Sequence, residues 1–100
     1  MPEPLSQAAI VLGERIRDAR LELGLSQEEI ANLASMNVSN YGKIERGLNN
    51  PTFHTLVRVA SVLNVDPGTL VTGLSSRQLP ALPASYSALD YIREQQRRVS

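Results

Sequence analysis

The stretch LSQEEIANLASMNVSNYGKIERG, residues 25–47, decides the fold of this chain. Ser26 followed three residues later by Glu29 is the capping-box pattern that begins a helix. Asn37 is a favourable N-cap for a second helix over residues 38–46, and Gly47 is a stop signal. These signals predict two short helices separated by a three-residue turn at 35–37.

Hydrophobic spacing and capping residues predict three more helices around this pair. Residues 7–23 carry apolar side chains at i, i+4, i+7 and i+11, which form one face of a helix. Thr52 can cap a helix that ends at Asn64, and Asp66-Pro67 begins a short helix to about residue 72. The side chains expected to face the core are Leu12, Ile16, Ala19, Leu23, Ile30, Ala31, Ala34, Tyr41, Ile44, Phe53, Leu56, Ala60, Leu63 and Leu70.

The C-terminal part of the chain reads as a linker followed by one helix. Residues 74–84 contain two prolines and two serines without a clear period. Ser87 and Asp90 form a second capping signal, and helical spacing continues to Val99. No strand-like alternation occurs, so we expect an all-α protein. Residues 1–10 would be an N-terminal extension with the start of the first helix, 11–73 the helical domain, and 74–100 the linker and C-terminal helix.

Length and composition exclude several classes of protein. The 100 residues are 42% hydrophobic and 20% charged, which fits one soluble domain. The chain has no cysteine and one histidine, so thiolate metal sites and disulfides are excluded and no cofactor is expected. No apolar run is long enough to span a membrane and no signal peptide is evident, so we expect a cytoplasmic protein. No His, Ser or Cys constellation suggests an enzyme.

Several signals in order carry a resemblance to a known family. They are the Ser-Gln-Glu-Glu start at 26–29, the Ile-Glu-Arg-Gly end at 44–47 and Asn-Pro-Thr at 50–52. Over residues 11–73 the chain resembles the phage repressor and Cro-type helix-turn-helix family, also called the xenobiotic-response-element (XRE) family. The resemblance implies a lambda-repressor-like five-helix domain and a sequence-specific transcriptional regulator that binds double-stranded DNA.

The resemblance also implies roles for individual residues. The base-reading positions are Val38, Ser39, Asn40 and Lys43, and the DNA-backbone positions are Gln27, Arg46, Asn50 and Thr52. A helix fits the major groove, where each base pair presents a distinct pattern of donors and acceptors. The alternative interpretation is that these side chains merely form a solvated helix face.

One acidic residue of the motif needs a different role. Glu45 would repel phosphate if it faced DNA. The resemblance pairs it with Arg20, as a structural ion pair that ties the first helix to the third. We therefore expect Arg20 and Glu45 to be scaffold residues.

The charge distribution leads to an expected homodimer. Residues 1–74 contain six basic and eight acidic side chains, so this part is formally −2 and the remainder is +2. Non-specific affinity for DNA comes mainly from phosphate neutralisation, so one copy should bind weakly and a palindromic operator would engage two. The apolar residues available for contact are Val71, Leu74, Leu79, Leu82, Tyr86, Leu89, Tyr91, Ile92 and Val99.

Two points stay open at this stage. The C-terminal helix could pack on its own first helix or on a partner, with Pro80 and Pro83 stiffening the arm. The net acidic domain also allows a second class of function: a helix-turn-helix interaction module, such as an antitoxin or repressor partner, with weak DNA binding.

Overall fold

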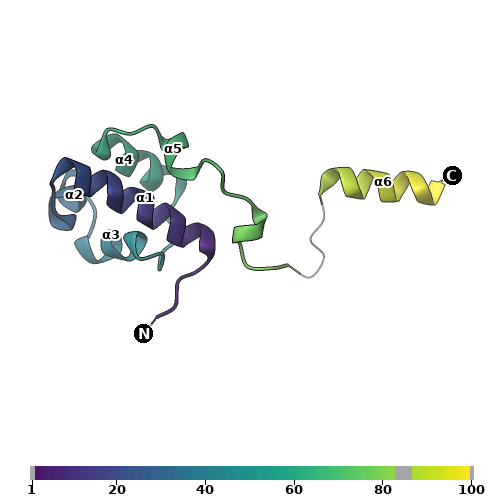
Figure 1. Cartoon of the computed structure of the whole chain (residues 1–100), viewed down its shortest axis with the longest axis horizontal. Helices are drawn as coiled ribbons and strands as arrows, with labels where there is room; N and C mark the ends of the chain where they lie inside the picture. The colour runs from purple at the N-terminus through teal and green to yellow at the C-terminus, as the bar shows by residue number, and fades with distance from the viewer. Residues whose placement is uncertain (1, 83–86, 100) are drawn as a thin grey trace.

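The computed structural model describes residues 2–82 and 87–99, and within them it is all-α (Figure 1). It contains a 3-10 helix, η1, and six α-helices. Their bounds are α1 Gln7–Leu23, α2 Gln27–Leu33, α3 Val38–Glu45, α4 Phe53–Leu63, α5 Pro67–Val71, η1 Ser76–Gln78 and α6 Ala88–Val99. Helices α1 to α5 gather into one bundle, and α6 stands apart from it at the far end of the chain. The molecule therefore extends over 61 × 32 × 20 Å.

Side-chain caps fix where the helices of the bundle begin. Ser26 and Glu29 form the expected capping box, and the Asn37 side chain accepts from the amides of Ser39 and Asn40. The Thr52 hydroxyl accepts from the amide of Thr55 at the start of α4. The Asp66 carboxylate likewise accepts from the amide of Gly68 at the start of α5. The predicted helix starts are thus confirmed, because each cap satisfies an amide that the helix itself leaves without a partner.

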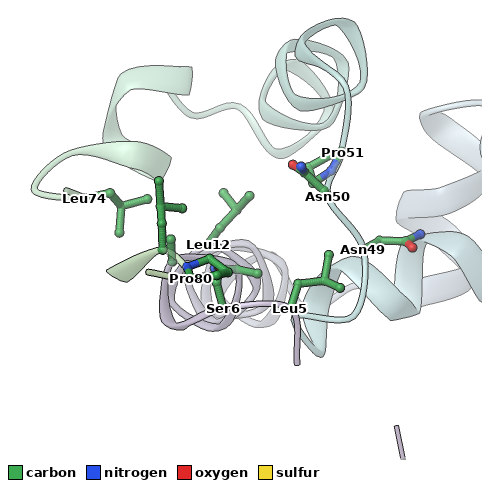
Figure 2. Close-up of a pocket in the computed structure, with 11 residues that line it drawn as sticks. Leu5, Ser6, Leu12, Asn49, Asn50, Pro51, Leu74 and Pro80 are labelled. Atoms are coloured by element: carbon green, nitrogen blue, oxygen red, sulfur yellow. The ribbon is translucent and has the colours of Figure 1, made fainter. Parts of the chain in front are cut away.

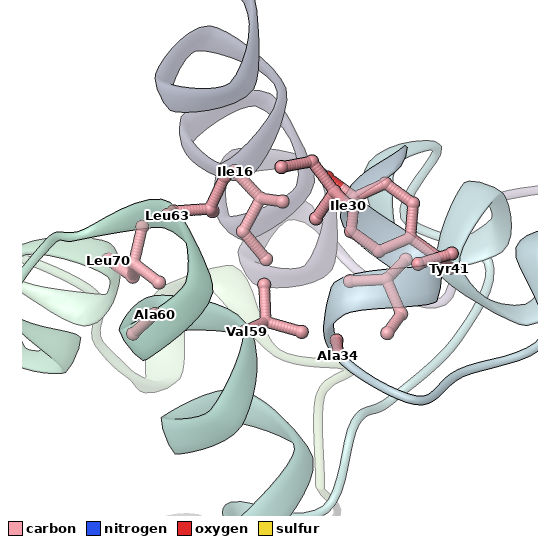
Figure 3. Packing of buried hydrophobic residues seen from close by; sticks show 10 residues of the cluster. Ile16, Ile30, Ala34, Tyr41, Val59, Ala60, Leu63 and Leu70 are labelled. Atoms are coloured by element: carbon pink, nitrogen blue, oxygen red, sulfur yellow. The ribbon is translucent and has the colours of Figure 1, made fainter. Parts of the chain in front are cut away.

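The core lies where α1, α2, α3 and α4 meet, with Leu70 closing it from α5 (Figure 3). Ten hydrophobic residues are buried there: Ile16, Ile30, Ala31, Ala34, Tyr41, Ile44, Val59, Ala60, Leu63 and Leu70. Leu12, Ala19 and Leu56 pack against this cluster in partly buried positions. Removal of these apolar surfaces from water is the main force that holds the five short helices together.

The prediction that Leu23 and Phe53 lie in the core is wrong. Leu23 is 47% exposed and Phe53 is 74% exposed. Both lie on the apolar face of their helix but at its end. The last buried residue of α1 is Arg20, and the first buried residue of α4 is Val59. Periodicity identifies the inward face correctly, but it does not show how far a helix extends beyond its neighbours.

The C-terminal part differs from expectation in one way, and the structure shows one of the two packings left open for its helix to be absent. The linker is not wholly irregular, since Ser75 and Gln78 form a capping box around the 3-10 helix. Helix α6 does not pack on α1, because Leu89, Tyr91 and Ile92 all remain about half exposed or more. Tyr86 and Pro83, which were also assigned to this arm, lie outside the described residues. The other differences are small: α3 ends at Glu45 with Arg46 as its cap, and α5 ends at Val71.

A close approach of α1 to α3 generates the first prediction. A Cβ on Gly13 would lie 2.4 Å from the carbonyl oxygens of both Ile44 and Glu45. Gly-to-Ala inside a helix ordinarily stabilises it by about 1 kcal/mol. Here we expect Gly13→Ala to lower the free energy of unfolding by about 1–3 kcal/mol, because two backbone segments must separate.

Urea unfolding of purified variants measures this effect. Gly68→Ala is the control, since its Cβ would meet no backbone segment and only the Asp66 side chain, at 3.3 Å. A Gly13→Ala protein as stable as the parent would show that α1 and α3 do not meet at this glycine.

Candidate nucleic-acid interface

Helix α3 presents one side to solvent and buries the other. Val38, Ser39, Asn40 and Lys43 are exposed, with Val38 at 44%. Tyr41, Gly42, Ile44 and Glu45 are buried. The Asn37 cap holds the first turn of the helix with Asn37 Oδ1 2.8 Å from the Ser39 nitrogen. The four expected base-reading side chains therefore share an accessible surface at the start and middle of α3.

The Glu45 carboxylate is the most densely bonded group in the described part of the chain. Arg20 donates from Nε to Oε2 at 2.7 Å and from Nη2 to Oε1 at 3.0 Å. The Tyr41 hydroxyl donates to Oε2 at 2.5 Å, and Gln27 Nε2 donates to Oε1 at 2.9 Å. Arg20 also donates to the carbonyl of Leu25 at 3.0 Å. The ion pair expected between α1 and α3 is present, and it extends to α2 through Gln27.

This hydrogen bonding sets the charge state of the network. Burial disfavours the ionised carboxylate, but the bonds from Arg20, Tyr41 and Gln27 outweigh it and hold the pKa of Glu45 below its usual 4.5. Burial and the same carboxylate raise the pKa of the Tyr41 phenol above its usual 10.0. Glu45 is thus a buried anion, while Tyr41 remains a neutral donor to it.

Gln27 and Arg46 meet above Gly42. A Cβ on Gly42 would lie 3.1 Å from Arg46 Nη1 and 3.3 Å from Gln27 Oε1. Gly42 therefore makes room for these two side chains, which was not part of the sequence interpretation. One hydrogen of the Gln27 amide is used by Glu45, and the second hydrogen on Nε2 remains for a contact outside the network. Arg46 itself is exposed.

The two remaining backbone candidates flank the start of α4. Thr52 is exposed, and its hydroxyl both accepts from the Thr55 amide and donates to Thr55 Oγ1. Its side chain is therefore occupied as a cap, and the free amides of the first turn of α4 are the donors at this point. Asn50 is exposed in the loop before it.

The exposed charges within residues 37–58 all have one sign. Between residues 37 and 58 the charged side chains are Lys43, Glu45, Arg46 and Arg58. Glu45 is 6% exposed and paired with Arg20, while the other three are exposed. The acidic residues that make residues 1–74 formally −2 lie elsewhere in the chain. The segment from α3 to the middle of α4 therefore presents only positive charge to its surroundings.

Sequence reasoning missed two long side chains that support the fold. Tyr41 was assigned to the core alone, although its i, i+4 spacing from Glu45 was a visible signal. Arg15 donates from Nη1 to the carbonyls of Leu70 at 3.1 Å and Thr72 at 2.7 Å, where α5 ends. No local pattern predicts this contact, because Arg15 and Leu70 are 55 residues apart in the sequence.

Neither a metal site nor a membrane span is visible in the described ranges. Within residues 2–82 and 87–99 no three His, Asp or Glu side chains gather closely enough to hold a metal ion. None of the helices described there combines the length and the apolarity that crossing a membrane requires.

The lowered pKa of Glu45 gives a prediction for pH dependence. A carboxyl whose pKa is lower in the folded than in the unfolded state stabilises the fold above the unfolded value and loses that contribution as pH falls. We expect the free energy of unfolding to decrease as pH drops below about 4.5. Part of that decrease should disappear in Glu45→Gln, which has no carboxyl to protonate.

Urea unfolding at a series of pH values between neutral and acid measures both proteins. Glu28→Gln is the control, since Glu28 is exposed and has no assigned partner. Equal pH dependence of the free energy of unfolding in the parent and in Glu45→Gln would show that protonation of Glu45 does not cause the loss of stability.

Comparison with known proteins finds similarity to helix-turn-helix regulators. The family model described as "Helix-turn-helix" matches residues 16–70. The HTH-type transcriptional regulator DdrOP3 of Deinococcus deserti is 36% identical over 63 residues, which cover 63% of this chain and 49% of DdrOP3. The chain thus spans about half the length of that curated relative.

Solved structures agree with the sequence match. The restriction-modification controller protein C.AhdI from Aeromonas hydrophila superposes with a TM-score of 0.61 at 34% identity, covering 62% of this chain and 94% of C.AhdI. SinR of Bacillus subtilis, solved in complex with DNA, superposes with a TM-score of 0.57 at 40% identity, covering 59% of this chain and 95% of that SinR chain. The chain belongs to the helix-turn-helix family of the XRE, or Cro/repressor, type, a family of transcriptional regulators.

Proposed function

We propose that this protein is a transcriptional regulator that binds double-stranded DNA with α3 in the major groove, and that it recognises a palindromic operator as a homodimer. The observation that carries the proposal is the charge of residues 37–58. Their only acid is buried against Arg20, so every exposed charge within this segment is positive. Such a surface attracts phosphate although the chain as a whole has no net charge.

The exposed side of α3 supplies the proposed base contacts. Val38 would pack on a thymine methyl group, and Ser39 and Asn40 would offer short hydrogen-bonding side chains. Lys43, one turn further on, would reach guanine acceptors or a phosphate. All four are free of the core, so they can touch DNA without disturbing the fold.

Phosphate contacts beside α3 would set its position in the groove. Arg46 and Gln27, which keeps one free amide hydrogen, both lie close to Gly42 of α3. Asn50 and the first amides of α4, which begins after Thr52, follow α3 along the chain. Positive partial charge at a helix N-terminus favours phosphate there. Contacts of this kind fix register without reading sequence.

The proposed dimer uses the arm that follows the domain of residues 11–73. Helix α6 exposes Leu89 at 63%, Ile92 at 48% and Val99 at 86%, and no part of its own bundle covers them. An apolar stripe of this kind is stabilised when a partner removes it from water. Pairing of two arms would link two copies of α3, as the two halves of a palindrome require.

Removal of the base-reading side chains tests the DNA contact. Ser39→Ala with Lys43→Ala should weaken binding to DNA from upstream of the protein's own gene, by about 1–3 kcal/mol for each lost contact. Fluorescence titration at several salt concentrations measures the affinity, and thermal melting confirms folding. The control is Arg17→Ala with Ser61→Ala, which removes one exposed positive charge and one exposed hydroxyl outside α3.

Unchanged affinity in the folded double variant would exclude this side of α3 as the reader. A parent protein that binds no DNA from that region would instead favour the interaction-module interpretation.

Polar substitution on α6 tests the dimer separately. Leu89→Ser with Ile92→Ser should convert a dimer at micromolar concentration into a monomer and weaken operator binding, because the apolar stripe is lost. Arg98→Ser, on the opposite side of the same helix from Leu89, should leave the dimer intact. Light scattering measures the mass, and truncation after Gly73 provides a second variant. A truncated protein that stays dimeric and binds operator equally well would show that the arm is not the dimer element.

A further inference from the structure

A cavity of about 390 Å³ lies apart from the four proposed base-reading residues of α3 and shares only Asn50 with the proposed DNA-backbone contacts. It is formed by the start of α1, the loop between α3 and α4, and the segment that follows α5. Figure 2 shows Leu74 and Pro80 on one side of it, Asn49 and Asn50 on the other, and Leu12 between them. Its described lining consists of Leu5, Ser6, Ala8, Ala9, Leu12, Asn49, Asn50, Pro51, Leu74, Leu79 and Pro80.

The lining specifies the chemistry of an occupant. None of these described residues is charged, and eight of the eleven are apolar. The side-chain amide groups of Asn49 and Asn50 have no hydrogen-bond partner among the described residues. Small-molecule sites have this composition: mostly apolar walls, with a few polar groups that fix orientation. A charged ligand would find no counter-ion here, so a neutral one fits.

The size of the cavity agrees with a compact organic molecule. Ligand sites commonly measure about 300–1,000 Å³, and a cavity of about 150 Å³ is enough to hold benzene. The volume of about 390 Å³ therefore has room for a fused bicyclic ring or an aliphatic group of similar bulk.

Three parts of the molecule meet at this cavity. The N-terminal wall is pinned to the end of α3 by a bond from the Leu5 amide to the Gly47 carbonyl at 2.9 Å. The opposite wall, from Leu74 to Pro80, contains η1 and leads toward α6. Leu79 is 54% exposed there, so the apolar wall is incompletely covered by the protein itself.

We propose that this cavity binds a small, neutral, largely apolar molecule with a hydrogen-bonding edge directed at Asn49 and Asn50. The occupant contacts both α1 and the segment after α5, and so it holds that segment against the bundle. The apolar group replaces water on Leu12, Leu74 and Leu79, which supplies the driving force. Binding takes place in the free protein and does not depend on DNA or on a dimer.

A second copy of α6 is a poorer occupant for this cavity. Five of its twelve residues are charged: Asp90, Arg93, Glu94, Arg97 and Arg98. Asp90 and Glu94 form ion pairs with arginines of the same helix, and insertion of α6 into this uncharged cavity would bury or break those pairs, which costs free energy. A compact neutral molecule brings no such cost.

Nuclear magnetic resonance titration of the full chain with indole tests the proposal, with cyclohexanol as an aliphatic probe. We expect saturable shifts in the amides of residues 5–12, 49–50 and 74–79, and slower amide hydrogen exchange in η1. Leu79→Ala should weaken binding several-fold. Leu82→Ala is the matched control: it lies three residues further along the same segment, is 73% exposed, and does not line the cavity.

A second variant separates loss of the site from loss of folding. Ala9→Phe places a ring in the cavity and should abolish the shifts while the rest of the spectrum stays dispersed. The proposal is overturned if neither probe gives saturable shifts in these residues up to its solubility limit. It is also overturned if Leu79→Ala and Leu82→Ala bind the probes equally, or if dilution of the protein alone produces the same shifts.

Discussion

The structure depends on one buried carboxylate. Glu45 accepts hydrogen bonds from Arg20 on α1, Gln27 on α2 and Tyr41 on α3, so a single group fixes the mutual position of three helices. An ion in the interior is costly unless it is paired and hydrogen-bonded, and here both conditions are met. Removal of one partner would leave the other charge buried and unpaired, a loss of about 3–5 kcal/mol. The orientation of α3 relative to α1 and α2 is therefore set by electrostatics as well as by apolar packing.

The same network explains how a formally acidic domain can present a basic surface. The one acid within residues 37–58, Glu45, is turned inward and neutralised by Arg20, while Lys43 and Arg46 stay outside. Net charge is a property of the whole chain, whereas a phosphate beside α3 responds to the charges within about a Debye length of it, roughly 8–10 Å. The sign at the surface is thus decided by which side chains are buried, which composition does not reveal.

Local signals made most of the fold predictable. The caps at Ser26, Asn37 and Thr52 depend on residues a few positions apart, and the predicted helix starts agree with the structure. The errors have a common cause in tertiary geometry, since the exposure of Leu23 and Phe53 depends on where neighbouring helices stop. The capping box around η1 was visible in the sequence but lay in a segment dominated by prolines and serines. In the candidate site, the Arg20–Glu45 pair could be predicted from the family resemblance. The space that Gly42 leaves for Gln27 and Arg46 could not, because it depends on the packing of α2 against α3.

Helix α3 divides support and recognition between its two sides. Tyr41 and Glu45 carry the hydrogen bonds to the scaffold, and the carbonyls of Ile44 and Glu45 face Gly13 so closely that no larger residue fits there. Val38, Ser39, Asn40 and Lys43 make none of these contacts and are exposed. Substitution on the exposed side therefore changes what the helix can touch without changing where it lies. Because the buried contacts and the exposed surface use different residues of eight consecutive positions, substitution of an exposed residue need not cost stability, whereas a change at Gly13, Arg20 or Glu45 disturbs the packing that holds this surface in place.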